Sequence, residues 1–172
     1  MKRVISIFVF LLFGIISFGQ VKNLSYPSSD NYGGIAYVST PGTQTIGTGG
    51  IFERLNEGAI AYTSAHLYNF THDDGRLTYT GISTIHVTIT VALAAKSGET
   101  AQVCNFRIAK NGTTIAATDM PITFTAVDYA ANTPLKWLDE VDTNDYYEIF
   151  GTSDTSADEF DINTLVFTIT EH

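Results

Sequence analysis

The chain has 172 residues, and its 9 Lys and Arg residues stand against 18 Asp and Glu residues, a net charge of −9 at neutral pH. A chain this acidic repels phosphate groups, so the composition argues against nucleic-acid binding. Cys104 is the single cysteine, which excludes an intrachain disulfide.

The N-terminus, MKRVISIFVFLLFGIISFGQ, has the pattern of a secretory signal peptide over residues 1–19. Two basic residues precede an apolar run at Val4–Ile16, and small residues follow it, so cleavage is expected between Gly19 and Gln20. A retained membrane anchor is the alternative, although the run is shorter than the roughly 20 apolar residues of a spanning helix. Cleavage leaves 7 basic and 18 acidic residues, a net charge of −11, in a secreted or cell-surface chain without a membrane segment.

Residues 20–50 are rich in Ser, Thr, Gly, Asn and Pro, and we expect them to form a loose arm apart from a short strand over Ile35–Ser39. The glycines of Gly47–Gly50 are not followed by the Lys-Ser/Thr pair of a phosphate-binding loop, so nucleotide binding is not expected. Residues 51–172 are then predicted to form one domain with one core.

After Ile51 the sequence consists of short extended runs separated by turn residues, and no run has a helical stripe of apolar residues. This organisation predicts an all-β sandwich or barrel. The expected strands are Ala59–Tyr68, Leu77–Thr80, Thr84–Ala94, Gln102–Lys110, Thr113–Thr118, Ile122–Val127, Leu135–Val141, Tyr146–Gly151 and Thr164–Thr170.

Alternation between apolar and polar residues is clearest in STIHVTITVAL, where the residues from Ile85 to Leu93 place Ile, Val and Leu on one face and Thr with His86 on the other. The strands Ile122–Val127 and Thr164–Thr170 follow the same rule, so the outer faces are rich in Thr and nearly uncharged. Such a face suits a subunit contact or a flat binding surface, because burying charge is costly. An ordinary exposed face made of a good strand former is the alternative.

The segment FRIAKNGTTIAAT contains Asn111-Gly112 between two extended runs, which predicts a two-residue hairpin turn. Asn111, Gly112 and Thr113 also match a glycosylation sequon, so the pair can serve as a turn, a sugar site or both. In the preceding strand Cys104 alternates with Phe106 and Ile108, and we expect a small buried apolar residue there and not a reactive thiol.

Catalytic and metal-binding motifs are not evident, and we expect the protein not to be an enzyme. His66 and His72 lie near Asp73 and Asp74, but their spacing fits no zinc template, and HDDG is also typical of a solvated turn. A secreted hydrolase that uses Asp73, Asp142 and His66 is the alternative from another class of function.

Acidic and aromatic residues gather late in the chain. The segments LDEVDTNDYYE and SDTSADEFD are expected to be solvated loops, and calcium is the one cofactor that they leave open. The neighbouring aromatic residues suit either a sugar-binding surface or the core, and the ligand-binding residues stay unassigned. These aromatic residues are Tyr129, Trp137, Tyr146, Tyr147 and Phe150.

Three short motifs occur in the order found in a known family: Phe70, Leu77, Tyr79 and Gly81, then Lys110, Asn111 and Gly112, then Asn144, Asp145, Tyr147 and Glu148. Through them the chain resembles, over Phe70–Thr170, the jelly-roll family of the complement first-component globular head and tumour necrosis factor, which includes trimeric head and fibre domains of bacteriophages. Asn144 stands where that family has Gly, and Asn accepts the left-handed backbone of a turn.

The resemblance implies an antiparallel jelly-roll sandwich of about ten strands, a homotrimer, and a binding role without catalysis. It also implies that Asn111 and Gly112 form a structural turn. We therefore expect an exported binding or adhesion module that recognises a surface glycan or a protein. The alternative is a virion spike or fibre head domain whose N-terminal apolar segment is retained in a membrane.

Overall fold

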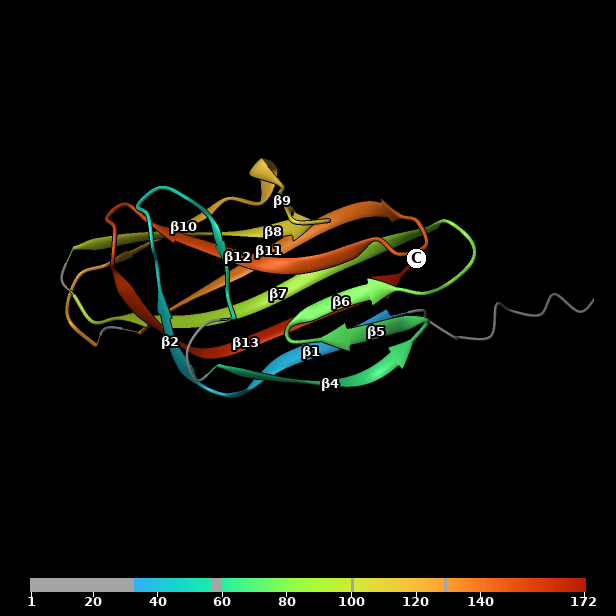
Figure 1. Cartoon of the computed structure of the whole chain (residues 1–172), viewed down its shortest axis with the longest axis horizontal. Helices are drawn as coiled ribbons and strands as arrows, with labels where there is room; N and C mark the ends of the chain where they lie inside the picture. Colours follow the sequence, from blue (N-terminus) through green and yellow to red (C-terminus); the bar gives the residue numbers. More distant parts are fainter. Residues whose placement is uncertain (1–32, 57–59, 100, 129) are drawn as a thin grey trace, which may run out of the picture. The chain divides into compact units, whose positions relative to one another are not determined.

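The structure is a computed structural model that describes residues 33–172 with the exception of 57–59, 100 and 129 (Figure 1). The described residues form two antiparallel sheets and one short 3-10 turn, Ala116–Thr118. They include no helix with the length and apolar character needed to cross a bilayer. The expectations for residues 1–32, including cleavage between Gly19 and Gln20, lie outside the described residues.

The first sheet, sheet A, has the strand order β11-β7-β13-β1-β4, with β2 paired to the beginning of β13. The two long strands β7 and β13 lie side by side along the middle of this sheet (Figure 1). Its strands are β1 (Gly33–Thr40), β2 (Gly42–Thr45), β4 (Ala61–Tyr68), β7 (Ile85–Ser97), β11 (Ala130–Val141) and β13 (Glu159–Glu171).

The second sheet, sheet B, has the order β10-β8-β12-β6-β5, with β3 paired to β12 and β9 paired to β8. Its strands are β3 (Glu53–Arg54), β5 (Phe70–Asp73), β6 (Arg76–Tyr79), β8 (Gln102–Lys110), β9 (Thr113–Thr114), β10 (Met120–Phe124) and β12 (Tyr146–Ser153).

The chain passes repeatedly between the two sheets: β6 in sheet B is followed by β7 in sheet A and β8 in sheet B, and β10, β11, β12 and β13 alternate in the same way. Five strands lie on the main path of each sheet, and three short strands are attached beside them. The fold is therefore an all-β antiparallel jelly-roll sandwich, which confirms the fold class predicted from the sequence.

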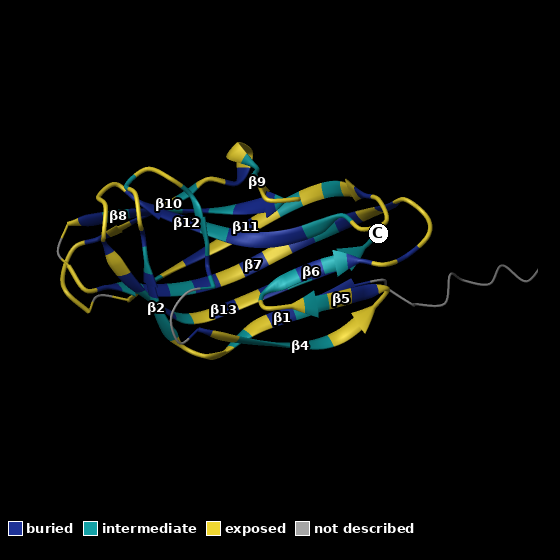
Figure 2. Ribbon diagram, viewed as in Figure 1, coloured by how far each residue is buried: buried dark blue, intermediate teal, exposed yellow. Residues whose placement is uncertain are grey.

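The core lies between the inner faces of the two sheets. Burial alternates residue by residue along β7 and β13, so that one side chain points into the core and the next points outward (Figure 2). In the core the rings of Phe106 and Phe160 meet edge to face with their centroids 5.5 Å apart. Each large apolar side chain that is fully buried in this way contributes about 1.5–3 kcal/mol.

The domain begins earlier than the composition of residues 20–50 suggested. Strand β1 is an interior strand between β13 and β4, and β2 pairs with β13, so the sandwich includes the residues from Gly33 on and the expected boundary at Ile51 is too late. The small residues of this segment serve close packing: a Cβ at Gly34 would lie 3.2 Å from Leu67 and 3.3 Å from Leu77.

Other strand ends also differ from the expectation. The predicted strand Thr113–Thr118 is only a two-residue pairing, because the Thr118 hydroxyl turns back to accept a hydrogen bond from the Ile108 N–H at 3.0 Å. Strands β11 and β13 begin five residues before their predicted starts, since both continue along β7. Within β13 the register shifts by one residue between Ile162 and Thr164, a β-bulge at Asn163.

Replacing Phe167 with Ala is expected to lower the free energy of unfolding by about 3–5 kcal/mol, because it leaves a cavity where a fully buried ring was. The adjacent Val166 points outward and is 36% exposed, so Val166→Ala is expected to change it by about 0.5 kcal/mol. Urea unfolding followed by tryptophan fluorescence measures both values. Equal losses for the two variants would contradict the assignment of Phe167 to the core side of β13 and of Val166 to its outer side.

Candidate functional site

The outer face of sheet A is the broadest uniform surface that the strand register defines. Each outward residue of β7 is paired with an outward residue of β11 on one side and of β13 on the other. These paired residues form rows across the sheet that continue from β13 through β1 to β4. The face comprises Asn132, Pro134, Lys136 and Leu138 of β11, Thr88, Thr90, Ala92 and Ala94 of β7, Thr164, Val166, Thr168 and Thr170 of β13, Ile35 and Tyr37 of β1, and Thr63 and Ala65 of β4.

These residues form the middle of the outer face, and Lys136 on the edge strand β11 is the single charged one among them. The outward residues Lys96 and Asp161 lie at one end of the face, and Glu140 lies at the other. Leu138, Tyr37 and Val166 add exposed apolar area, with exposed fractions of 61%, 37% and 36%. A shallow hollow of about 430 Å³ lies over β7, β11 and β13 and is lined mainly by Ala92, Ala94, Pro134 and Thr164. Burying this face against a partner therefore costs little free energy of desolvation.

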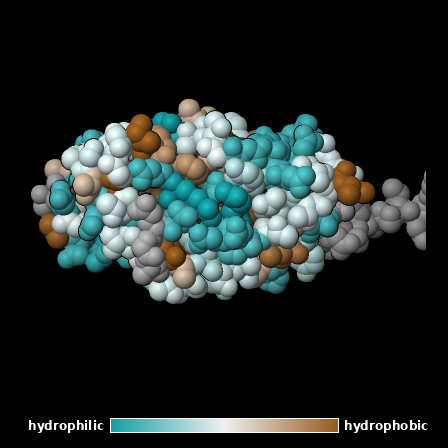
Figure 3. All heavy atoms as spheres, in the orientation of Figure 1, coloured by the Kyte–Doolittle hydropathy of each residue, from teal (hydrophilic) through white to brown (hydrophobic). Residues whose placement is uncertain are grey.

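The other face of the protein differs in kind from this surface. The view in Figure 3 shows mostly hydrophilic and neutral residues, with hydrophobic residues in separate spots and a hydrophilic centre.

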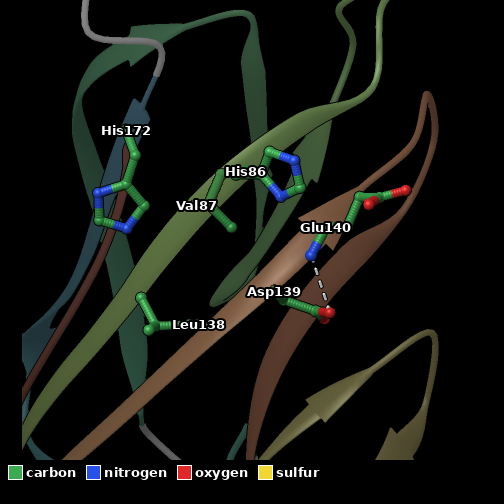
Figure 4. A pocket seen from close by; sticks show the side chains of 6 residues that line it. All are labelled: His86, Val87, Leu138, Asp139, Glu140 and His172. Atoms are coloured by element: carbon green, nitrogen blue, oxygen red, sulfur yellow. Dashed lines mark hydrogen bonds between the residues drawn. The ribbon is translucent and has the colours of Figure 1, made fainter.

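One end of the outer face carries a row of polar residues around a pocket of about 470 Å³ (Figure 4). His86 pairs with Glu140 across β7 and β11, and the His172 N–H donates to the His86 carbonyl at 3.0 Å. In Figure 4 the two imidazole rings and the carboxylates of Asp139 and Glu140 do not converge on one point. Among the described residues, no three His, Cys, Asp or Glu side chains are arranged to hold a metal ion.

The residues of the hydrolase alternative lie in separate elements. His66 is in β4, Asp73 ends β5, and Asp142 follows β11, where its carboxylate accepts a hydrogen bond from the Thr84 hydroxyl at 2.5 Å. The Nε2 of His72 accepts a hydrogen bond from the Gly75 N–H at 3.0 Å, and burial lowers the pKa of its imidazole. The HDDG segment is a hydrogen-bonded turn between β5 and β6.

The acidic segments considered for calcium have partners within the protein. Asp139 accepts a hydrogen bond from the Tyr147 hydroxyl at 2.6 Å, and Asp161 accepts one from the Thr43 hydroxyl at 2.6 Å. Asp158 is buried and accepts a hydrogen bond from the Ser153 hydroxyl. These contacts use carboxylate oxygens that a cation would need.

Two of the motifs found in the sequence meet at the Asn111-Gly112 turn. Asn111 and Gly112 lie between β8 and β9 with φ angles of 52° and 76°, the left-handed values that a two-residue hairpin requires. The Asn111 side chain accepts from the Tyr146 N–H at 2.9 Å and donates to Asp145 at 2.7 Å. The amide nitrogen that a sugar would occupy is therefore engaged in holding the turn to the start of β12.

Asp145 is the electrostatic centre of this contact. Burial raises the pKa of its carboxyl, but the Asn111 amide, the Asp142 N–H and the Lys110 ammonium together outweigh burial and lower the pKa below its ordinary value. Lys110 lies 2.9 Å from Asp145 and 3.5 Å from Asp139, and these two carboxylates raise the pKa of Lys110 against the effect of burial. The segments KNG and NDYYE thus hold the turn between β8 and β9 against the start of β12.

Glu148, the last residue of that motif, is only 2% exposed although it lies on the outer side of sheet B. Its Oε1 accepts from the Arg54 Nε and the Arg76 Nη2, both at 2.9 Å, and the Arg76 guanidinium covers the Tyr146 ring at 4.1 Å. A buried carboxylate is tolerated here because two guanidinium groups neutralise it. Local sequence does not reveal this cluster, since its three charged residues come from three strands.

The aromatic residues proposed for sugar binding do not form one exposed set. Tyr147 is fully buried, and Trp137 packs against the core. Tyr146 lies under Arg76, and Phe150 is half-buried in β12. Tyr129 lies outside the described residues, so two of the four described members of this set, Tyr147 and Trp137, belong to the interior.

Cys104 is fully buried in β8, on the same side of the strand as Phe106 and Ile108. Burial raises the pKa of its thiol to about 12, although a hydrogen bond with Ser153 acts in the opposite direction. A thiol with this pKa is protonated at neutral pH and is a poor nucleophile.

No family model matches the chain, and no curated protein matches it. Among solved structures, the PRD1 vertex protein P5 is similar with a TM-score of 0.48 and 10% identity, over 82% of this chain and 96% of that one. The dimeric latent PorU from Porphyromonas gingivalis is similar with a TM-score of 0.39 and 8% identity, over 78% of this chain but only 13% of that one. At these TM-scores and identities neither likeness identifies a family.

The Cys104 thiol is expected to react with a thiol reagent such as dithionitrobenzoate only when the protein unfolds, because it is buried and protonated. Labelling at pH 8 should be slow in buffer and immediate in 6 M guanidinium. Rapid labelling of one thiol per chain in buffer would contradict the described environment.

Replacing Asn111 with Gly keeps a residue that adopts the left-handed turn but removes two hydrogen bonds, so we expect a loss of about 1–3 kcal/mol in the free energy of unfolding at pH 7. The lowered pKa of Asp145 stabilises the folded state above the ordinary aspartate pKa, and this stabilisation is lost as the pH falls through the folded-state value.

The difference in the free energy of unfolding between wild type and Asn111→Gly should therefore become smaller at pH values below about 4. Chemical denaturation at pH 7, 5, 4 and 3 measures it, with Thr113→Ala, an exposed neighbour, as the control. A difference that stays constant over this range would show that the contribution of Asn111 to stability does not depend on the ionisation of Asp145.

Proposed function

We propose that the chain is an exported, non-enzymatic binding module that associates as a homotrimer through the outer face of sheet A and recognises a surface glycan or a protein. The observation that carries the proposal is the scarcity of charge in the middle of that face, where Lys136 is the single charged residue among those described, while Lys96, Asp161 and Glu140 lie at its two ends. Elsewhere the chain is strongly acidic.

Charge distribution supports self-association through this face and not through another. Two copies of a chain with a net charge of −9 repel each other wherever carboxylates are opposed. The rows that contain Thr90, Ala92 and Val166 hold no carboxylate from β11 across to β4, so copies can meet there without burying unpaired acids. A threefold arrangement is what the family resemblance implies.

A trimer also suits a module that binds repeated ligands on a surface. Each subunit repeats the same site, so binding of the second and third sites becomes intramolecular and the apparent affinity rises by about 10²–10⁴ without new contacts. Weak single sites on loops are then sufficient for adhesion.

The test is the molar mass of mature Gln20–His172 by size exclusion with light scattering, where we expect a multiple of three chains. Ala92→Glu should lower the mass threefold, because it places three carboxylates in a face that excludes water. Thr123→Glu, an exposed position on β10 in sheet B, adds the same charge elsewhere and should leave the mass unchanged.

A wild-type mass of one chain, or an Ala92→Glu variant that keeps the wild-type mass, would refute association through this face. If the trimer forms, wild type and Ala92→Glu are compared for retention on immobilised glycans, and the trimer should be retained more strongly. The N-terminal mass of the natural protein separates export from a virion role, since export predicts Gln20 as the first residue and a retained segment predicts Met1.

A further inference from the structure

The two sheets leave four edge strands, and their free edges are not equally protected. The edges are β11 and β4 in sheet A and β10 and β5 in sheet B. Natural sheets prevent unwanted pairing by placing proline or charged residues on edges or by keeping edge strands short.

Three of the edges carry such features. Strand β11 has Pro134 together with Lys136 and Glu140, and β10 has Pro121 within five residues. Strand β5 has four residues and ends with Asp73.

Strand β4 lacks all of them. Its eight residues, AYTSAHLY, include no proline, lysine, arginine or carboxylate, and within the described part of the chain it pairs only with β1. Leu67 and Tyr68 are 38% and 56% exposed at its end. A strand of this length and composition offers unpaired N–H and C=O groups without any deterrent to pairing.

We propose that β4 pairs edge to edge with β4 of a second copy of the chain, antiparallel and related by a two-fold axis. The register with β1 is continuous over Tyr62–Ala65 and is interrupted by a bulge at His66, where φ is 52°. The axis therefore passes through Thr63, so that Thr63 of one copy lies opposite Thr63 of the other and both side chains stay on the outer face. Sheet A of one copy then continues into sheet A of the next.

A second copy is the occupant that the charges favour. When a strand pairs with the same strand of a second copy, a residue near the two-fold axis lies opposite the same residue of the other copy. A charged residue there would therefore meet a like charge. Strand β4 has none, in a chain where acids outnumber bases by two to one. The pairing uses the edge of sheet A, so it does not depend on the proposed trimer: it doubles whatever unit the outer face forms.

The first test compares the molar mass of wild type and Thr63→Lys by light scattering. We expect an even number of chains in wild type and half that mass in the variant, with a dissociation constant raised at least tenfold. Lysine reduces the net negative charge, so weaker association cannot come from general repulsion; it comes from two ammonium groups meeting at the axis. Thr123→Lys, exposed on β10, should behave as wild type.

Failure of this proposal is distinguishable from failure of the trimer. Ala92→Glu tests the outer face, and masses of one, two, three and six chains identify which contacts form. Thr63 also lies at the margin of that face, so a halved mass in Thr63→Lys identifies loss of the edge pair, and a threefold lower mass identifies loss of the outer-face contact. A wild-type mass of one or three chains, or an unchanged mass in Thr63→Lys, overturns the edge pairing. Thermal unfolding of each variant shows that the fold is kept.

Cross-linking provides a second measurement, because the single native cysteine is buried. Thr63→Cys treated with a short bismaleimide should give a covalent pair of chains, whereas Thr123→Cys should not. No pair from Thr63→Cys, the result expected if residues before Gly33 or a foreign peptide occupy the edge, overturns the proposal. Equal pairs from both variants indicate random collision and overturn it as well.

Discussion

The ladder between β7 and β13 is the constraint on which the rest of the structure depends. It fixes two long strands in one register through the middle of sheet A, and every outward position of one strand lies beside an outward position of the other. Because side chains alternate with a period of two, this one register assigns Ile, Val, Leu and Phe to the core and Thr, Ala and Val to the outer face together. The core and the proposed interface are therefore two sides of the same pairing.

The charges are arranged around this frame. Asp145, Lys110 and Asp139 join the start of β12 to the end of β8, while Arg54, Arg76 and Glu148 join the β3 segment to sheet B. The partly exposed ion pairs of Lys110 contribute little each, about 0–1 kcal/mol, so their main effect is to decide which segments lie together. The acids of the chain are concentrated in these clusters and in turns, which leaves the middle of sheet A free of them.

Alternation and turn chemistry made much of the fold predictable. The limits of β8 agree with the prediction, and β7 agrees within a few residues, because local patterns encode both. Strand β5 and the early start of β11 could not be predicted in this way, since their neighbours in the sheets stabilise them. The same holds for β1, where packing of Gly34 against Leu67 depends on contacts distant in sequence.

The candidate surface was predictable in composition but not in extent. Thr-rich alternation was visible in β7 and β13, whereas the contributions of Tyr37 and Leu138 required the strand order. The unprotected edge of β4 had no signal of its own, because a strand becomes an edge only through the topology. The Glu148 cluster is similar, since Arg54 and Arg76 reach it from other strands.

The bulge at Asn163 has a consequence for how this chain can change in length. Upstream of it β13 pairs with β2, and downstream it pairs with β1, so a single extra residue lets one strand serve two partners. A deletion of Asn163 would leave Ile162 beside Ala95 and Thr164 beside Ala94 in an unbroken ladder, so the side chains downstream would keep their faces. A deletion at another position of β13 would move the residues beyond it by one position and exchange their inside and outside faces. Turns of this sandwich can gain or lose residues over generations, and within β13 the bulge is a position where a residue can be lost without exchanging the inside and the outside of the sheet.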